Sequence, residues 1–250
     1  MLASVAVIQL YHVTKRYANG IEALRDVSVH IHEGEFVFLS GPSGAGKSTL
    51  INLICRFYDI QEGSITIDDH DIRGVSLKTL RDQIGIVLQE PFLFNGPIRD
   101  NIAYGHPLAS PSEIVAAAKA ANCHDCIMAQ IDGYDTVVGE RGVRMSAGER
   151  QRIAVCRALA VAPEIVFLDE PTASLDPAAI VAIEKILQRA MHAGRKLILV
   201  SQSIGQVERL AQDVIFVHGG KVTEHTPVDE FLNSPRSDPA RAFIHGVLFE

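Results

Sequence analysis

The sequence lacks the features that mark several broad classes of protein. Acidic residues outnumber basic ones, 30 against 23, and the formal net charge of −7 gives no support to nucleic-acid binding, which calls for a basic surface. No apolar run approaches the roughly 20 residues that span a bilayer. The apolar start has neither a basic region nor an obvious signal-peptide cleavage site. We therefore expect a cytosolic chain that is soluble by itself.

Cysteine is also scarce. Cys55, Cys123, Cys126 and Cys156 are too few and too scattered for a disulfide framework. The spacing Cys123-His-Asp-Cys126 is compatible with half of a metal site, but no second pair or nearby histidine cluster completes four ligands, so we interpret these cysteines as helix packing. The 250 residues suffice for one α/β domain with an appendage or for two small domains.

The most informative stretch is a glycine-rich segment that fits the pattern G-x-x-x-x-G-K-[ST]. An apolar run of strand length, 35–40, precedes it, and 50–54 can continue a helix after it. Glycines let the main chain wrap an anion, the helix N-terminus supplies positive potential, Lys47 reaches terminal phosphates and Ser48 offers a hydroxyl to magnesium. A chance glycine-rich turn is the alternative. The candidate ligands are Gly41, Pro42, Ser43, Gly44, Ala45, Gly46, Lys47, Ser48 and Thr49.

The hydrophobic pattern predicts an α/β fold with a helical insertion. The N-terminal part contains several segments of strand character, and some of them are expected in an antiparallel sheet. The stretch from Pro97 to about Ala160 has no strong strand candidate. Segments typical of buried strands follow it. The expected strands are 5–12, 27–32, 63–68, 84–88, 165–168, 197–200 and 214–217, and the expected helices are 112–121, 146–160 and 177–190, with two short helices between 228 and 250.

Two acidic residues follow the predicted strand 165–168. A carboxylate at the end of a parallel strand beside a phosphate loop can hold magnesium through water, which is the role expected for Asp169. The next carboxylate, Glu170, can orient or deprotonate an attacking water. A strand that simply ends in polar residues is the alternative.

The segment Ser146, Ala147, Gly148 and Glu149 begins the predicted helix 146–160. A serine, a glycine and a helix N-terminus can form a second anion site. Ser146 with Glu149 three residues later is also a capping box, and both interpretations can hold together. The segment resembles the signature of ATP-binding cassette (ABC) proteins, usually Leu-Ser-Gly-Gly-Gln, with departures at Met145, Ala147 and Glu149. In that family the signature completes the nucleotide pocket of another subunit.

The resemblance covers nearly the whole chain and implies further roles. Tyr17 matches the aromatic residue that stacks on adenine, and Gln89 matches the glutamine that senses magnesium and contacts the membrane subunit. Asp176 matches a residue at the dimer interface, although it can equally be the N-cap of the helix that starts at Pro177. Gln202 stands where the family usually has a histidine that bridges the γ-phosphate and the catalytic machinery. Glutamine cannot become cationic near neutral pH, so we expect slow hydrolysis.

The resemblance implies the ATP-binding subunit of an ABC transporter, with ATP and Mg²⁺ as cofactors. The expected catalytic residues are Glu170, Lys47 and Gln202, and the expected metal ligands are Ser48, Gln89 and Asp169. Its partners would be a second ABC ATPase, in a homodimer or heterodimer, transmembrane permease subunits, and a substrate-binding protein if it is an importer. It would lie in the cytoplasm, peripheral on the inner face of the cell membrane.

The predicted organisation is one ABC ATPase domain. It has a P-loop NTPase core with an N-terminal antiparallel β subdomain, a helical signature subdomain and a C-terminal helical tail. The predicted ranges are 1–96 and 161–227 for the core, 97–160 for the helical subdomain and 228–250 for the tail.

Segments of the chain resemble different subfamilies, so import and export stay open. Exporter-like stretches lie at 89–94, 100–105 and 136–142, importer-like ones at 170–176 and 238–244, and 33–42 resembles the cell-division ABC ATPase. Two alternatives to a transporter subunit remain: a mechanical ATPase that transports nothing, and a slow nucleotide switch weakened by Gln202.

Overall fold

A computed structural model describes residues 6–32 and 35–246. The chain divides into two compact units, Met1–Arg81 with Ile198–Glu250, and Asp82–Leu197. Residue 5 of the first expected strand, residues 33 and 34, and the last four residues of the expected tail lie outside the described residues. The fold is of the expected α/β class, with an antiparallel sheet, a second sheet that contains parallel strands, and a group of helices between strands.

The first unit contains a four-stranded antiparallel sheet in the order β2-β1-β4-β5. Its strands are β1 (Ala6–Arg16), β2 (Glu22–His32), β4 (Glu62–Ile67) and β5 (His70–Asp71). Strand β2 starts five residues before the predicted 27–32 because a break hides the alternation: Asp26 has a φ of 53°, and the pairing with β1 shifts register there. Beyond it Val27, Val29 and Ile31 are buried while Ser28 and His30 are exposed.

The first unit also contains parallel strands. Strand β3 (Phe36–Ser40) is buried along its whole length and pairs in parallel with β9 (Asp213–His218), which pairs antiparallel with β10 (Lys221–Pro227). Strand β8 (Lys196–Val200) runs across the boundary between the units. The prediction missed β10 because its inward-facing positions include the polar residues Glu224 and Thr226, both of which are buried.

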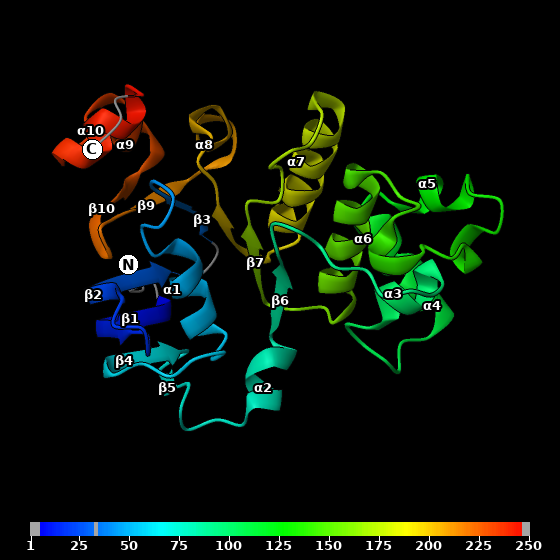
Figure 1. Ribbon diagram of the computed structural model, residues 1–250, viewed down its shortest axis with the longest axis horizontal. Coiled ribbons are helices and arrows are strands. Elements are labelled where there is room, and N and C mark those ends of the chain that lie inside the picture. The colour runs from blue at the N-terminus through cyan, green and yellow to red at the C-terminus, as the bar shows by residue number, and fades with distance from the viewer. Residues whose placement is uncertain (1–5, 33–34, 247–250) are drawn as a thin grey trace. The chain divides into compact units, whose positions relative to one another are not determined.

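The helices of the first unit are short. They are α1 (Lys47–Ile54), α8 (Ile204–Leu210), α9 (Val228–Asn233) and α10 (Asp238–Ile244), and α2 (Leu77–Asp82) ends at the boundary. The two predicted tail helices are confirmed, and they lie together in Figure 1. The second begins at Asp238, because Ser237 caps it and proline fits the first turn.

The second unit combines two parallel strands with most of the helices (Figure 1, green to yellow). Its strands are β6 (Ile84–Val87) and β7 (Ile165–Asp169), and its helical segments are α3 (Ile98–Ala103), α4 (Pro111–Ala120), α5 (His124–Met128), η1 (Gly133–Asp135), η2 (Glu140–Gly142), α6 (Ala147–Ala160) and α7 (Pro177–His192). The predicted helices 112–121, 146–160 and 177–190 correspond to α4, α6 and α7 within one or two residues. Both α3 and α4 pack against α6.

Arg157 on α6 is half-buried. Its guanidinium donates to the main-chain oxygens of Asn101 and Phe92 at 2.9 and 2.8 Å, and to the Asn101 side-chain oxygen at 3.0 Å. Asn101 is only 1% exposed and also bonds the main chain of Phe94 and Pro97. Arg157 and Asn101 thus fix the segment between β6 and α3 to the long helix α6.

No helix among the described residues is both long enough and apolar enough to cross a bilayer.

Candidate functional site

The glycine-rich loop joins β3 to α1, as expected. Gly41 and Gly46 have φ angles of 138° and 111°, in the region that favours glycine. A Cβ atom at Gly41 would lie 2.1 Å from the main-chain oxygen of Val217, and one at Gly46 would lie 2.6 Å from that of Ala23. Both positions therefore require glycine, because other residues disfavour these φ angles and because a Cβ atom would clash with a main-chain oxygen.

Lys47 is the first residue of α1 and folds back across this loop. Its side chain is 6% exposed, and its Nζ donates to the main-chain oxygens of Gly41 and Pro42, each at 2.7 Å. Gly46, at the N-cap position of α1, supplies no side-chain cap. An ammonium group and the N-terminus of a helix therefore converge within one short loop, and this combination favours an anion.

Tyr17 lies beside the start of α1. Its hydroxyl is 3.2 Å from Thr49 Oγ1, and its ring makes an edge contact with Tyr58 at 5.5 Å between centroids. The Nζ of the buried Lys15 lies 5.4 and 5.5 Å from the centroids of the two rings. Sequence reasoning found Tyr17 but not Tyr58 or Lys15, because neither belongs to a recognisable motif.

Gln202 follows the end of β8 and lies at the same strand edge as the phosphate loop. Ser40, the last residue of β3, donates from Oγ to the Ser201 main-chain oxygen at 3.1 Å, and Ser201 N donates to Leu39 O at 3.4 Å. The phosphate loop and the exposed Gln202 therefore follow the carboxyl ends of the neighbouring strands β3 and β8.

In the second unit, β6 and β7 bring Gln89, Asp169 and Glu170 to one edge. Val87 pairs with Leu168 in parallel register, so Gln89 and the two carboxylates follow the matched ends of the strands. Glu170 has a φ of 48°, a conformation that costs an L-residue about 1–2 kcal/mol. Its main-chain oxygen accepts from Ala173 N at 3.1 Å. The backbone at Glu170 is thus held in a form that non-glycine residues seldom adopt, as is common at functional sites.

The capping box predicted at the start of α6 is confirmed. Ser146 Oγ accepts from Glu149 N at 3.3 Å, while Ser146 N and Oγ donate to Glu149 Oε2 at 2.8 and 2.7 Å. Gln130 Nε2 donates to the other carboxylate oxygen, Oε1, at 3.3 Å. The carboxylate of Glu149 therefore occupies donors that an external anion would use at this helix end.

The start of α6 lies close to the start of α7, which has a cap of its own. Gly148 is buried, and a Cβ atom there would lie 3.0 Å from the Cβ of Ala179 on α7. Asp176 caps α7 by accepting from Ala179 N at 3.0 Å, which confirms its structural interpretation.

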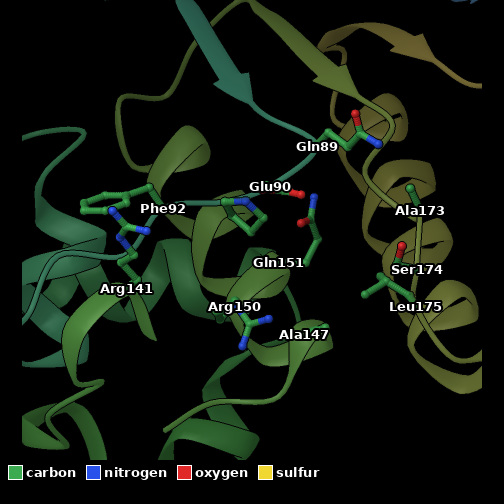
Figure 2. A pocket seen from close by; sticks show the side chains of 11 residues that line it. Gln89, Glu90, Phe92, Arg141, Ala147, Arg150, Gln151, Ala173, Ser174 and Leu175 are labelled. Carbon is green, nitrogen blue, oxygen red and sulfur yellow. The ribbon is translucent and has the colours of Figure 1, made fainter. Parts of the chain in front are cut away.

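A cavity of about 460 Å³ in the second unit brings three of the expected segments together. Figure 2 shows its lining residues coming from the loop after β6, from the start of α6 and from the segment before α7, with Arg141 added from η2. The Gln151 side chain points toward Glu90 in that view, and its Nε2 is buried without a hydrogen-bond partner. The lining residues are Gln89, Glu90, Pro91, Phe92, Arg141, Ala147, Arg150, Gln151, Ala173, Ser174 and Leu175.

Sequence reasoning recognised three of the segments around this cavity but not all of its polar groups. Arg150 and Gln151 are missed because they follow the signature on α6 and read as ordinary polar helix positions. Their direction toward the cavity depends on how α6 packs, which the sequence does not specify.

Comparisons with known proteins agree with one another. The family profile described as "ABC transporter" matches residues 24–173. The chain is 48% identical over 201 residues to "ATP-dependent lipid A-core flippase" of Syntrophus aciditrophicus (strain SB), covering 80% of this chain and 33% of the relative. It is 44% identical over 217 residues to "ATP-binding cassette sub-family B member 6" of Homo sapiens, covering 87% of this chain and 26% of the relative. The chain thus spans a third or less of these relatives.

A solved structure resembles the whole chain. "Structure of a bacterial Atm1-family ABC exporter with ATP bound" matches with a TM-score of 0.88 and 34% identity, covering 100% of this chain and 44% of that one.

Proposed function

The chain belongs to the ABC transporter family, and from that membership we propose that it binds and hydrolyses ATP to drive an exporter. The observation that carries the proposal is the buried Lys47 ammonium folded over a glycine-rich loop at a helix N-terminus. Export is favoured over import because the similar proteins include a flippase and an exporter. An importer-type substrate-binding protein is therefore not part of the proposal.

The phosphate loop is proposed to bind the triphosphate. Lys47 Nζ now bonds two main-chain oxygens, and on binding it would exchange them for oxygens of the terminal phosphates. The first turn of α1 would direct its N–H groups at the phosphates. The half-buried Tyr17, held against Thr49 and Tyr58, would stack on the base.

The residues proposed to hold magnesium fit that ion. Ser48, Gln89 and Asp169 offer a hydroxyl, an amide oxygen and a carboxylate, the hard oxygen ligands that Mg²⁺ prefers. Phosphate oxygens and water would complete the coordination of the ion. Bound magnesium would neutralise charge on the phosphates.

Hydrolysis is proposed to depend on Glu170 and Gln202. Glu170, in a turn closed by the hydrogen bond from Ala173 N to its main-chain oxygen, would accept a proton from the water that attacks the γ-phosphorus. Gln202, exposed at the strand edge beside the loop, would donate an amide hydrogen bond to the γ-phosphate. Without a group that can become cationic, transition-state stabilisation should be weaker than with histidine.

Two copies of the ATPase, or one copy and a related partner, are proposed to pair head to tail. Ser146, Ala147, Gly148 and Glu149 of one copy would then complete the phosphate pocket of the other, and Asp176 would lie at the interface. The polar cavity lined by Gln89, Arg141 and Gln151 would receive a loop of the membrane part, because the buried Gln151 Nε2 is a donor without a partner. That membrane part would be a separate polypeptide or another segment of a longer chain.

A slow nucleotide switch is the second candidate. It is favoured by the Glu149 carboxylate, which bonds Ser146 N and Oγ and puts negative charge where a phosphate would approach. Such a protein would bind ATP and dimerise weakly, with hydrolysis too slow to drive transport.

The test of the proposal is nucleotide-dependent dimerisation of the Glu170→Gln variant. With ATP and Mg²⁺ the variant should elute from gel filtration as a dimer, because ATP binds but is not cleaved, whereas the wild type should return to monomer as ATP is consumed. The double variant Glu170→Gln, Lys47→Ala is the matched control and should stay monomeric. Normal hydrolysis by Glu170→Gln would remove Glu170 from its proposed role.

A further inference from the structure

Two cysteines meet at the start of α5. Cys123 occupies the N-cap position of this helix and Cys126 lies one turn further on, so their side chains share one side of the turn. The two sulfur atoms are 3.6 Å apart, and the Cys126 thiol donates to the Cys123 main-chain oxygen at 3.0 Å. Both are free thiols. A disulfide needs about 2.05 Å between sulfurs, a change that small side-chain rotations in a Cys-X-X-Cys turn can supply.

The surroundings of the pair are unlike simple apolar packing. Cys156 on α6 interacts with Cys123, and the guanidinium of Arg152, also on α6, interacts with Cys126. Arg152 Nε is buried and has no hydrogen-bond partner. A cation beside a thiol stabilises the thiolate, which is the nucleophile in disulfide exchange.

The two thiols differ in access. Cys123 is completely buried, whereas Cys126 is partly exposed. A small oxidant can therefore reach Cys126 first, and Cys123 lies directly behind it. This is the arrangement of an attacking thiol and a resolving thiol.

We propose that Cys123 and Cys126 form a redox-active dithiol that small-molecule disulfides such as glutathione disulfide convert to an intramolecular disulfide. The Cys126 thiolate, having released its proton to water, attacks one sulfur of glutathione disulfide; a mixed disulfide forms and one glutathione thiolate leaves and takes up a proton. The Cys123 thiolate, whose proton has also passed to water, then attacks the Cys126 sulfur, forms the intramolecular disulfide and expels the second glutathione as a thiolate, which takes up a proton. The protein loses two protons and two electrons, and glutathione disulfide gains two of each to give two glutathione thiols.

The same contacts predict slow exchange at neutral pH. The hydrogen bond with Cys123 and burial raise the pKa of Cys126, while Arg152 opposes them. For Cys123 the hydrogen bond with Cys126 lowers the pKa, but the contact with Cys156 and burial outweigh it and raise the pKa overall. Few thiolates are therefore present near pH 7, and oxidation should speed up as the pH rises.

The pair is also connected to the start of α6. The segment that follows α5 carries Gln130, which holds the Glu149 carboxylate of the capping box. Oxidation would thus act on a segment that positions Ser146 and Glu149.

The experiment follows the fate of glutathione on the reduced 250-residue chain. After incubation with glutathione disulfide and alkylation of the remaining thiols, mass spectrometry should find the wild type two hydrogens lighter, without glutathione, and unalkylated at Cys123 and Cys126. The Cys123→Ser variant should instead keep one glutathione on Cys126, because the resolving thiol is gone. The Cys126→Ser variant should be modified much more slowly, and Cys156→Ser should still form the disulfide.

Two results would overturn the proposal. One is a wild type that keeps glutathione on Cys126, or that stays unmodified after prolonged incubation with excess glutathione disulfide at alkaline pH. The other is a disulfide that joins Cys156 to either cysteine. The wild-type measurement decides the question even if a variant fails to fold, and it does not depend on ATP binding.

Discussion

Gln202 is the residue at which this chain departs most clearly from its family's usual sequence, because a histidine is expected there. Gln202→His should raise the steady-state ATPase rate of the assembled transporter, by up to about 10² if an imidazole restores one well-placed transition-state donor. The exposed position after Ser201 can accept the ring without repacking a core. Inorganic phosphate release by wild type, Gln202→His and Gln202→Ala is the measurement.

Gln202→Ala is the matched control, and it should fall below the wild type because it removes the amide donor. Equal rates for all three proteins would show that residue 202 does not contact the reacting phosphate.

Asn101 is a second residue whose role shows only in three dimensions. Its side chain bonds Phe94 N, Phe94 O, Pro97 O and Arg157, all in a nearly water-free position. Asn101→Ala would leave several of these groups unpaired, so the free energy of unfolding should fall by about 2–4 kcal/mol. Urea denaturation measures this loss. Asn95→Ala, at an exposed asparagine in the same segment, should change stability by less than about 0.5 kcal/mol.

Residues within fixed motifs could be found from the sequence, and residues that act through packing could not. Lys47 is recognised because the spacing of the loop defines it. Tyr58, Lys15 and Arg157 are not, since each depends on a neighbour distant in sequence. The conformation of Glu170 was also not predictable, because nothing in its side chain favours a positive φ.

At the scale of elements, periodicity predicts the long helices and the buried strands, and it fails where polar residues face inward or a bulge interrupts. Helices α4, α6 and α7 begin after clear caps, Ser110, Ser146 and Asp176, so their starts are predicted to within one residue. Strand β10 carries no comparable pattern, and α8 is missed although Ser203 caps it, because seven residues are too few to show a helical period. The roles assigned to the candidate site and the division of the chain into subdomains stay predictions.

The N-terminus of α6 can be tested by removing one charge. Glu149→Gln keeps a capping box, because glutamine also serves at that position, but it removes the carboxylate that bonds Ser146. An anion should then approach the helix end more easily, and the concentration of ATP needed to dimerise the Glu170→Gln background should fall several-fold. Analytical ultracentrifugation at graded ATP concentrations provides the readout.

Two controls separate charge from capping. Glu149→Ala removes both, so it should lower the free energy of unfolding by about 1 kcal/mol as well. Gln130→Ala removes only the amide that bonds Glu149 Oε1. It should lower the ATP concentration needed for dimerisation by less than Glu149→Gln does. Weaker dimerisation of Glu149→Gln would show that the carboxylate helps the helix end to bind phosphate.

For the whole molecule, the main question is whether one copy can make a complete site. Lys47 and Ser146 belong to different units of the chain. If the phosphate loop of one copy works with the signature of the other, a defect in either segment should be rescued by mixing two differently damaged copies. This consequence distinguishes a site shared between copies from a site enclosed by one.

Mixing Lys47→Ala with Ser146→Arg provides that test. Each variant alone should have almost no ATPase activity, because any dimer that it forms has two damaged sites. In a mixed dimer one site combines the intact Lys47 of one copy with the intact Ser146 of the other, while the second site carries both defects. If exchange is random, about half of the dimers are mixed and each has one working site, so activity should return to about a quarter of the wild-type rate when sites act independently, and to less when they are coupled. Phosphate release as a function of the mixing ratio should peak near equal amounts, because mixed dimers are most abundant there.

A double variant carrying both changes, added to either single variant, is the matched control and should restore nothing. Activity that stays at the sum of the separate variants, while native mass spectrometry detects mixed dimers, would contradict a shared site and leave each copy to bind and cleave ATP by itself.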